Sequence, residues 1–303
     1  ATVFNETSHL DYPWQTTSSN QNSANLSEFL AWDSAISMGS SEHDGIQSVV
    51  VSNTGDTFVL GHSNKVFQKD NCFLSRNSDV SDHLSSPFFA KFGTNGTCIW
   101  MLGLTSSGAH STDDLAKHKL GLDSKNNLYA ILSIGGYGHT ETIGNVSFTI
   151  DSGSNAYLLK INANGVLQWV TKPSNSYGCH CSMSIDSSDN IIVGFRGSGN
   201  ELMINKYDTN GTMLSNYVSV GGHIQTYDSV IDSNDNLYIV GNYAYSASFT
   251  GSTSFSCSNC WAGYVVKFDH NLSLDWAKEV KSSSSSSSVR GIDLSFDNEI
   301  YVI

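Results

Sequence analysis

The chain has 303 residues, and its 15 Lys and Arg residues against 28 Asp and Glu give a net charge of −13. Such a charge predicts repulsion from phosphate backbones and anionic membrane surfaces, so we expect no nucleic-acid partner. No apolar run reaches the roughly 18 residues that a membrane-spanning helix needs, so we expect no membrane span. Abundant Ser, Thr, Asn and Gly favour short strands and turns over helices.

The N-terminus and the cysteines point to a secreted protein. The chain begins at Ala1 without a basic, hydrophobic leader, so we expect a mature extracellular chain whose signal peptide has been removed. Six cysteines are an even number, which in a secreted chain predicts disulfides and leaves about 15 pairings open. We expect a local closure between Cys257 and Cys260 and a bridge between Cys72 and Cys98. The alternative is a zinc site that combines Cys257 and Cys260 with Cys179, His180 and Cys181, because thiolates and imidazoles at short spacing are ligands for that ion.

Six Asn-x-Ser/Thr sequons are present, about the number that composition produces by chance, so only their positions are informative. Three fall at the same turn of the repeats described below, where a glycan would point to solvent. The predicted glycosylation sites are Asn5, Asn25, Asn95, Asn145, Asn210 and Asn271.

One pattern repeats along the chain, and residues 227–276 show it best. A strand-like run (227–231) is followed by an Asp/Asn turn (232–236, DSNDN), and a second run follows at 237–241. A loop containing two cysteines leads to a third run (263–268, GYVVKF), and a fourth run ends at Trp276. Four short antiparallel strands cannot bury both faces of one sheet alone, so each copy needs neighbours of its own kind.

The copies divide the chain into an irregular segment, 1–28, and a repeat domain, 29–303. Full copies are expected at about 45–100, 116–169, 181–218 and 227–276, with a partial copy at 289–303 that 29–36 would complete. Lysines 91, 160, 206 and 267 recur in phase at spacings of 69, 46 and 61 residues. This period, with four strands in each unit, predicts a β-propeller.

Four details complete the pattern. The lysines are expected to reach solvent along their aliphatic stems. The third copy has Ser215 near the place of the repeated tryptophan. The connection 62–87 is longer than most loops in compact domains, which favours a binding element or an excursion held by Cys72. The seven serines at 282–288 predict a solvated linker.

These motifs resemble a known repeat family. An Asp-Ser-x-x-Asn turn, a Leu-Tyr-Ile-Val-Gly strand, an aromatic-x-x-Lys-Phe strand and Asn-Gly before a Trp are similar to the β-propeller repeats of extracellular proteins of the SBBP type, and more distantly to PQQ-like blades. The resemblance implies an all-β propeller of four-stranded antiparallel blades, with four full blades and partial blades at both ends. The resemblance indicates little about function, because the family is defined by residues that form the blades and not by a catalytic set.

The two ends leave three arrangements open. The chain closes on itself as a five-bladed ring, or it is a fragment of a larger propeller. In the third arrangement, a terminal strand of one molecule completes a blade of the next and builds a filament. In the last case the partner is the protein itself or another extracellular protein.

The candidate chemistry is sparse. The turns 123–127, 186–190 and 232–236 carry oxygen ligands that calcium prefers, although Asp and Asn also suit hairpin turns, so no cofactor is expected and calcium stays an alternative. Neither a His-Glu-x-x-His nor a Gly-x-Ser-x-Gly motif is present, so we assign no catalytic residue. Trp261 lies out of phase with the blade tryptophans and is the candidate ligand-binding residue, suited to stacking on a sugar.

We therefore expect a non-catalytic secreted scaffold, either a surface or adhesion protein or a component of an extracellular filament. The alternatives are a carbohydrate-binding or carbohydrate-active propeller, with glycans as partners, and a PQQ-like oxidoreductase. The enzymatic alternatives need polar residues that converge on the axis-facing loops, and only the loops 62–87 and 242–262 offer them.

Overall fold

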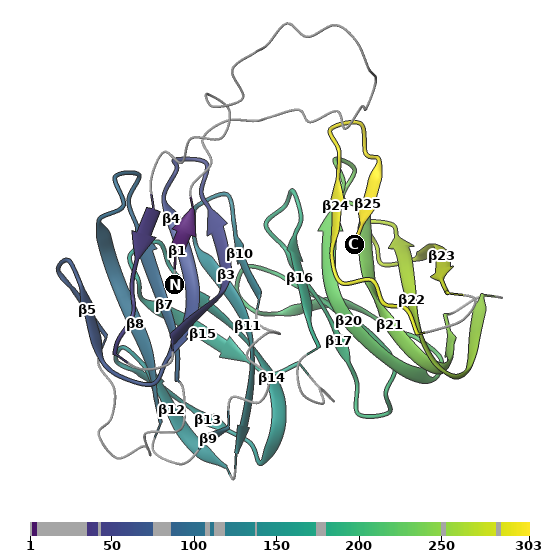
Figure 1. Cartoon of the computed structure of the whole chain (residues 1–303), viewed down its shortest axis with the longest axis horizontal. Helices are drawn as coiled ribbons and strands as arrows, with labels where there is room; N and C mark the ends of the chain where they lie inside the picture. The colour runs from purple at the N-terminus through teal and green to yellow at the C-terminus, as the bar shows by residue number, and fades with distance from the viewer. Residues whose placement is uncertain are drawn as a thin grey trace, which may run out of the picture.

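The described part of the chain consists of strands and turns (Figure 1). The computed structural model describes residues 2–4, 35–41, 44–74, 86–106, 110–111, 119–136, 138–173, 180–249, 253–282 and 286–303. Within these ranges there is no helix that is long and apolar enough to cross a membrane.

Four antiparallel sheets follow one another along the chain, and each contains the four strands of one repeat. Blade 1 contains β3 (Asp44–Val51), β4 (Thr57–Ser63), β7 (Ser86–Phe92) and β8 (Cys98–Ser106). Blade 2 contains β10 (Lys119–Leu122), β11 (Leu128–Gly136), β14 (Gly153–Ile161) and β15 (Leu167–Thr171). Blade 3 contains β16 (Ser182–Ile185), β17 (Ile191–Arg196), β18 (Leu202–Tyr207) and β19 (Met213–Val218). Blade 4 contains β20 (Gly222–Ile231), β21 (Leu237–Ser248), β22 (Ser254–Phe268) and β23 (Leu274–Val280).

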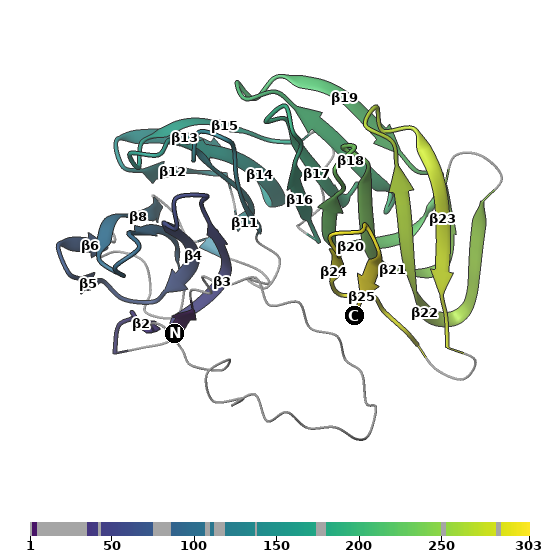
Figure 2. The same ribbon diagram turned by 90° about the horizontal axis from the view of Figure 1, so that it is seen from above.

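The first strands of successive blades lie side by side, and the sheets fan out from them in sequence order (Figure 2). Strand β3 contacts β10, β10 contacts β16, and β16 contacts β20. This arrangement is that of a β-propeller, and it confirms the predicted fold class. An ion pair of 3.0 Å between Lys119 of blade 2 and Asp228 of blade 4 joins inner strands that flank blade 3.

The remaining strands form small additions. Strands β24 (Ile292–Leu294) and β25 (Ile300–Val302) make a two-stranded sheet, and β24 contacts β20 of blade 4. Strand β1 (Thr2–Phe4) pairs with β2 (Ala35–Ser37). Since residues 29–34 lie outside the described ranges, the composite blade of 29–36 with 289–303 stays a prediction.

Blade 1 is extended by a hairpin from blade 2. Strands β12 (His139–Ile143) and β13 (Val146–Ile150) lie in the connection between β11 and β14, yet β12 pairs with β8. Ile143 lies opposite Leu104, and both join the apolar layer between the two blades. The short β9 (His110–Ser111) in turn follows β8 and pairs with β11. These exchanges tie blades 1 and 2 together, and the repeat pattern did not predict them.

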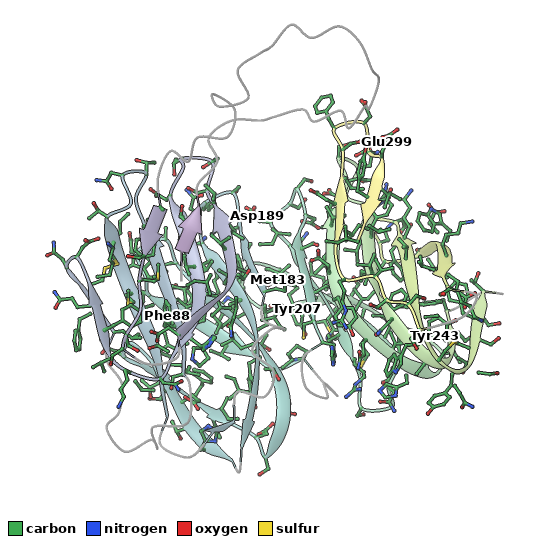
Figure 3. The ribbon with its side chains drawn as sticks, in the orientation of Figure 1. Phe88, Met183, Asp189, Tyr207, Tyr243 and Glu299 are labelled. Carbon is green, nitrogen blue, oxygen red and sulfur yellow. A yellow bond between two sulfur atoms is a disulfide. The ribbon has the colours of Figure 1, made fainter. Side chains whose placement is uncertain are left out.

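Apolar layers between blades hold the fold together because the middle strands are buried on both faces. Along β11, Leu128 and Ala130 face blade 1, whereas Tyr129 and Ile131 face blade 3. Figure 3 shows side chains such as Phe88, Met183 and Tyr243 packed within and between the sheets. Burying each large apolar side chain contributes about 1.5–3 kcal/mol.

A glycine and a tryptophan from neighbouring blades explain one of the repeat motifs. Trp100 Nε1 at the end of blade 1 donates a hydrogen bond of 3.1 Å to the carbonyl of Ala163 in blade 2. Its ring lies on Gly165, where an added Cβ would approach within 2.9 Å of the indole. Trp169 of blade 2 makes the same contact with blade 3, where its Nε1 donates a hydrogen bond of 3.2 Å to the Thr209 carbonyl. The Asn-Gly turn therefore receives the tryptophan of the preceding blade.

The missing tryptophan of the third copy has a matching change in blade 4. Ser215 of β19 replaces the tryptophan, and the turn that follows β22 has Leu272 where the other turns have glycine. Leu272 is buried in the same apolar cluster as Tyr217 and Phe268. Without an indole to accommodate, the turn position is filled by an aliphatic side chain.

The repeated lysines reach solvent less than we expected, because Lys91 is buried and the other three are only partly exposed. Lys91 is buried and lies 3.0 Å from Asp56, and Lys206 lies 2.7 Å from Asp186. Burial alone would raise the pKa of Asp186, but hydrogen bonds from Lys206 and Asn190 outweigh it, so the pKa is lowered. Each of these two lysines neutralises an aspartate on a turn of its own blade.

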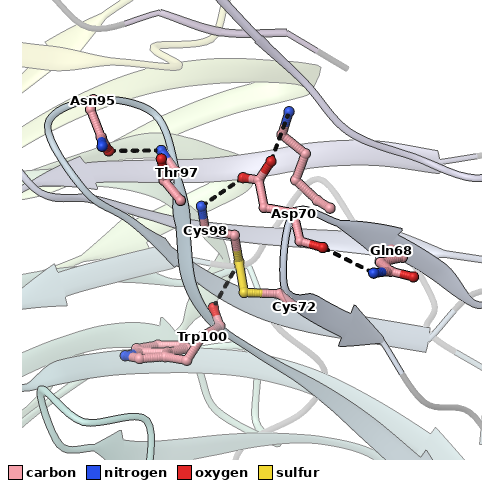
Figure 4. Close-up of a disulfide and its surroundings, with 8 residues drawn as sticks. Gln68, Asp70, Cys72, Asn95, Thr97, Cys98 and Trp100 are labelled. Carbon is pink, nitrogen blue, oxygen red and sulfur yellow. Dashed lines mark hydrogen bonds and ion pairs between the residues drawn. A yellow bond between two sulfur atoms is a disulfide. The ribbon is translucent and has the colours of Figure 1, made fainter.

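The long 62–87 connection begins with a stapled hairpin. Strands β5 (Phe67–Lys69) and β6 (Cys72–Leu74) pair with each other, and a disulfide joins Cys72 to Cys98 of β8 as predicted (Figure 4). Asp70 in the hairpin turn accepts a hydrogen bond of 2.9 Å from the Cys98 amide. The disulfide and this bond dock the hairpin on blade 1.

Candidate functional site

A cavity of about 320 Å³ lies on the face of blade 4 that points away from blade 3. Strands β20, β21 and β22 and the segment that leads to β24 surround it. Its lining is polar and aromatic: Gln225, Tyr227, Asn242, Trp261, Ser286, Ser287, Ser288 and Arg290. The predicted ligand-binding residue Trp261 therefore lies in a cavity, and the sequence did not mark most of the side chains around it.

Trp261 owes its position to a bulge in β22. Ala244 pairs with Trp261, but the next residue, Tyr245, pairs with Cys257, so three residues of β22 bulge out of the ladder. A disulfide between Cys257 and Cys260 closes this bulge, as predicted. Tyr245 adopts a φ of +64°, which lets β21 follow the bulge. The half-buried Trp261 stands at the end of the regular ladder.

The end of the serine run is part of the site and is not a free linker, which corrects the expectation for these residues. The Trp261 amide donates to Ser286 Oγ at 3.1 Å, and the Ser287 amide donates to the Trp261 carbonyl at 2.8 Å. Ser287 Oγ also donates to the Val280 carbonyl at 2.8 Å. These bonds hold the segment beside the tryptophan.

Arg290 has a fixed orientation at this cavity. Its guanidinium lies 4.1 Å from the centre of the Tyr227 ring, and its Nε donates to Ser288 Oγ at 3.4 Å. Tyr227 is held in turn by a bond of 2.5 Å from its hydroxyl to Gln225 Oε1. Stacking on an aromatic ring restrains the guanidinium plane and leaves its outer N–H groups directed to solvent.

Asn242 is the buried polar group of the cavity. The residue is only 6% exposed, and its Oδ1 atom has no hydrogen-bond partner in the described part of the chain. Buried amide oxygens are normally paired, and one without a partner costs stability. A ligand that donates a hydrogen bond would satisfy this oxygen.

A second cavity of about 280 Å³ shares Trp261 as part of its lining, together with His223, Tyr245 and Asn259. The His223 ring packs edge-on against Trp261, with 5.2 Å between ring centroids. Burial lowers the pKa of His223, and the charge of Arg196 lowers it further. A neutral His223 therefore accepts the hydrogen bond of 2.8 Å from Arg196 Nη1.

The Asp/Asn turns of blades 2, 3 and 4 form a separate cluster, in which Ser124 bonds to Asp189 and Ser187 bonds to Asp235. Asp123 Oδ1 accepts hydrogen bonds from two amides of its own turn, and Ser124 of blade 2 donates twice to Asp189 of blade 3, each at 2.7 Å. Asn126 and Asp189 adopt the left-handed conformation that these turns require. Across the described ranges, no group of three or more His, Cys, Asp or Glu side chains could hold a metal ion. Calcium stays a prediction, and no catalytic residue is assigned.

The other predicted site residues lie away from the cavity or outside the described ranges. Four sequon asparagines are exposed on surface turns, and their glycosylation stays a prediction: Asn95, Asn145, Asn210 and Asn271. Cys181 is disulfide-bonded. Asn5, Asn25 and Cys179 lie outside the described residues.

Comparison with known proteins gives similarity to solved structures alone. No family model and no curated protein matches the chain. A protein of unknown function from Bacteroides caccae shares 9% identity, covering 87% of this chain and 90% of its own, at a TM-score of 0.39. An exo-β-1,3-galactanase from Clostridium thermocellum shares 9% identity over 81% of this chain and 50% of its own, at 0.39. The Dos1 propeller shares 11% identity over 85% of this chain and 74% of its own, at 0.41.

Proposed function

We propose that this protein is a non-catalytic, secreted β-propeller that binds carbohydrate at the Trp261 cavity and serves as a surface or adhesion scaffold. The observation that carries the proposal is Trp261 itself, half-buried and shared by two adjoining cavities. An indole offers a flat apolar face to a sugar ring, and the amides and hydroxyls beside it match sugar hydroxyls. Two adjoining cavities would accept more than one ring of a chain.

Binding is favoured over hydrolysis by the lining of the cavity. Glycosidases use a pair of carboxylates that flank the scissile bond. The described lining of the Trp261 cavity has amides, hydroxyls, two aromatic rings and an arginine, and it has no carboxylate. Membership of the SBBP-type repeats is part of this proposal, while the PQQ-like oxidoreductase has no observation in its favour.

The disulfides support the proposal that the protein is secreted. The Cys72–Cys98 and Cys257–Cys260 bonds suit an oxidising compartment, and the exposed sequons suit N-glycosylation. A mass shift on enzymatic removal of N-glycans from native material tests this part.

A glycan array tests the binding function. We expect the wild-type protein to bind a defined set of glycans, Trp261→Ala to lose that binding, and Phe73→Ala to retain it. Phe73 is a matched control because it is an exposed aromatic residue in the hairpin of blade 1, remote from the cavity. Equal binding by all three proteins would reject Trp261 as the site.

Self-assembly by strand addition is a second candidate function, favoured by β25. This strand pairs with β24 on one edge, and no described strand pairs with its other edge. It exposes Ile300, Tyr301 and Val302, with Tyr301 57% exposed. Unpaired apolar edge strands recruit strands of other chains. Light scattering tests this candidate: we expect concentration-dependent growth that Val302→Pro abolishes.

A further inference from the structure

The Trp261 cavity holds a cation that no carboxylate of the described residues neutralises. The chain is acidic, and its described lysines commonly pair with carboxylates, as Lys119 does with Asp228 at 3.0 Å. Arg290 differs, because among the described residues no carboxylate lies within ion-pair distance of its guanidinium. Its side-chain contacts are the Tyr227 ring and one long bond to Ser288.

The same cavity holds the unpartnered oxygen of Asn242. Asn242 lines the cavity and is 6% exposed, and its buried Oδ1 atom lacks a donor among the described residues, so a ligand donor that reaches this atom would satisfy it. A sugar hydroxyl both donates and accepts, so it pairs with either end of the amide.

From these two observations we propose that the ligand is an acidic sugar, a pyranose that carries a carboxylate, as in a uronic acid. This inference rests on the proposed carbohydrate-binding function and names the class of sugar. The planar fork of an arginine matches a carboxylate through two parallel hydrogen bonds, and the Tyr227 ring holds that fork in place before binding. In this complex the Trp261 indole stacks on the face of the sugar ring, Asn242 accepts a hydrogen bond from a sugar hydroxyl, and Arg290 donates hydrogen bonds to the carboxylate.

Isothermal titration calorimetry on the full chain tests the proposal with defined probes. The acidic probes are tri-galacturonate, tri-mannuronate and a hyaluronan hexasaccharide, and the neutral probes are the methyl esters of the two trisaccharides, which keep the rings and lose the charge. We expect at least one acid to bind, with about tenfold or greater loss of affinity for its neutral counterpart. For hyaluronan the counterpart is its carboxyl-reduced form.

Variants separate the role of each group. Arg290→Met should lower the affinity for the acid to that of the ester and leave the ester unchanged, and Arg290→Lys should restore only part of the loss, because an ammonium lacks the fork. Lys125→Met is the matched control, since it removes one positive charge from an exposed turn residue outside the cavity. Asn242→Leu should weaken binding of acid and ester alike while the urea midpoint stays equal or rises, an outcome that a merely structural asparagine would not give.

Other outcomes overturn the inference in distinguishable ways. Equal affinity for acid and ester would reject the carboxylate and leave carbohydrate binding intact. Binding of sulfated sugars with none of the acids would assign Arg290 to a sulfate and reject the uronate. Failure of every acidic and neutral sugar to bind would reject both the inference and the proposed function.

Discussion

The contact between Trp100 and Gly165 predicts a specific loss of stability. Gly165 has a φ of +80°, and an added Cβ would lie 2.9 Å from the Trp100 indole. A left-handed conformation costs an L-residue about 1–2 kcal/mol, and forcing a methyl group into a packed contact costs about 1–3 kcal/mol more. We therefore expect Gly165→Ala to lower the free energy of unfolding by about 2–5 kcal/mol.

Urea unfolding of two further variants separates these contributions. Gly144 has a φ of +59° with no atom within 4 Å of an added Cβ, so Gly144→Ala should cost only the backbone term. In a Trp100→Leu background the packing term disappears, and Gly165→Ala should then cost about as much as Gly144→Ala. If Gly165→Ala costs the same with and without the indole, the contact does not explain the Asn-Gly motif, and the reasoning is refuted.

Three further predictions follow from the turns and the bulge. Asp189→Gly removes the acceptor of two hydrogen bonds from Ser124 and still suits the left-handed backbone at this position. It should cost about 1–3 kcal/mol in urea unfolding, whereas an unchanged midpoint would show that these bonds add nothing. The pKa of Asp186 is lowered from 3.8 in the folded protein, so the stabilisation that its carboxylate provides is complete above that value and is lost as the pH falls through the lower folded pKa. The free energy of unfolding of Asp186→Asn should therefore fall less steeply with decreasing pH than that of the wild type. Identical pH profiles for the two proteins would contradict this. Replacing Cys257 and Cys260 together by serine should weaken glycan binding and change the urea midpoint little, because the disulfide closes the bulge beside Trp261. Unchanged glycan binding would show that the bulge does not position the site.

The blades could be predicted because they follow from local periodicity. Alternating apolar runs and Asp/Asn turns recur in each copy, and strands with both faces buried pack in a stack. The β12–β13 hairpin could not be predicted, because its partner β8 belongs to another copy and no local pattern names a partner strand. The lysines were misjudged for a similar reason: Lys206 and Asp186 meet only once the strands of blade 3 are paired.

The site was predicted in part. Trp261 stood out because it breaks the phase of the repeated tryptophans. Arg290 and Asn242 did not, because an unpaired charge and an unsatisfied oxygen are defined by neighbours that come together only in the fold. Composition alone also misread the serine run. It predicts solvation, but the hydroxyl of Ser286 and the backbone amide of Ser287 both bond to the Trp261 main chain.

The central claim is that carbohydrate binds at Trp261, and a crystal structure of the protein soaked with a sugar that binds in solution tests it most directly. We predict a sugar ring against the Trp261 indole, with a hydroxyl within hydrogen-bond distance of Asn242. A sugar bound elsewhere, for example at the acidic turns around Asp123 and Asp189, with the Trp261 cavity free of sugar, would contradict the account.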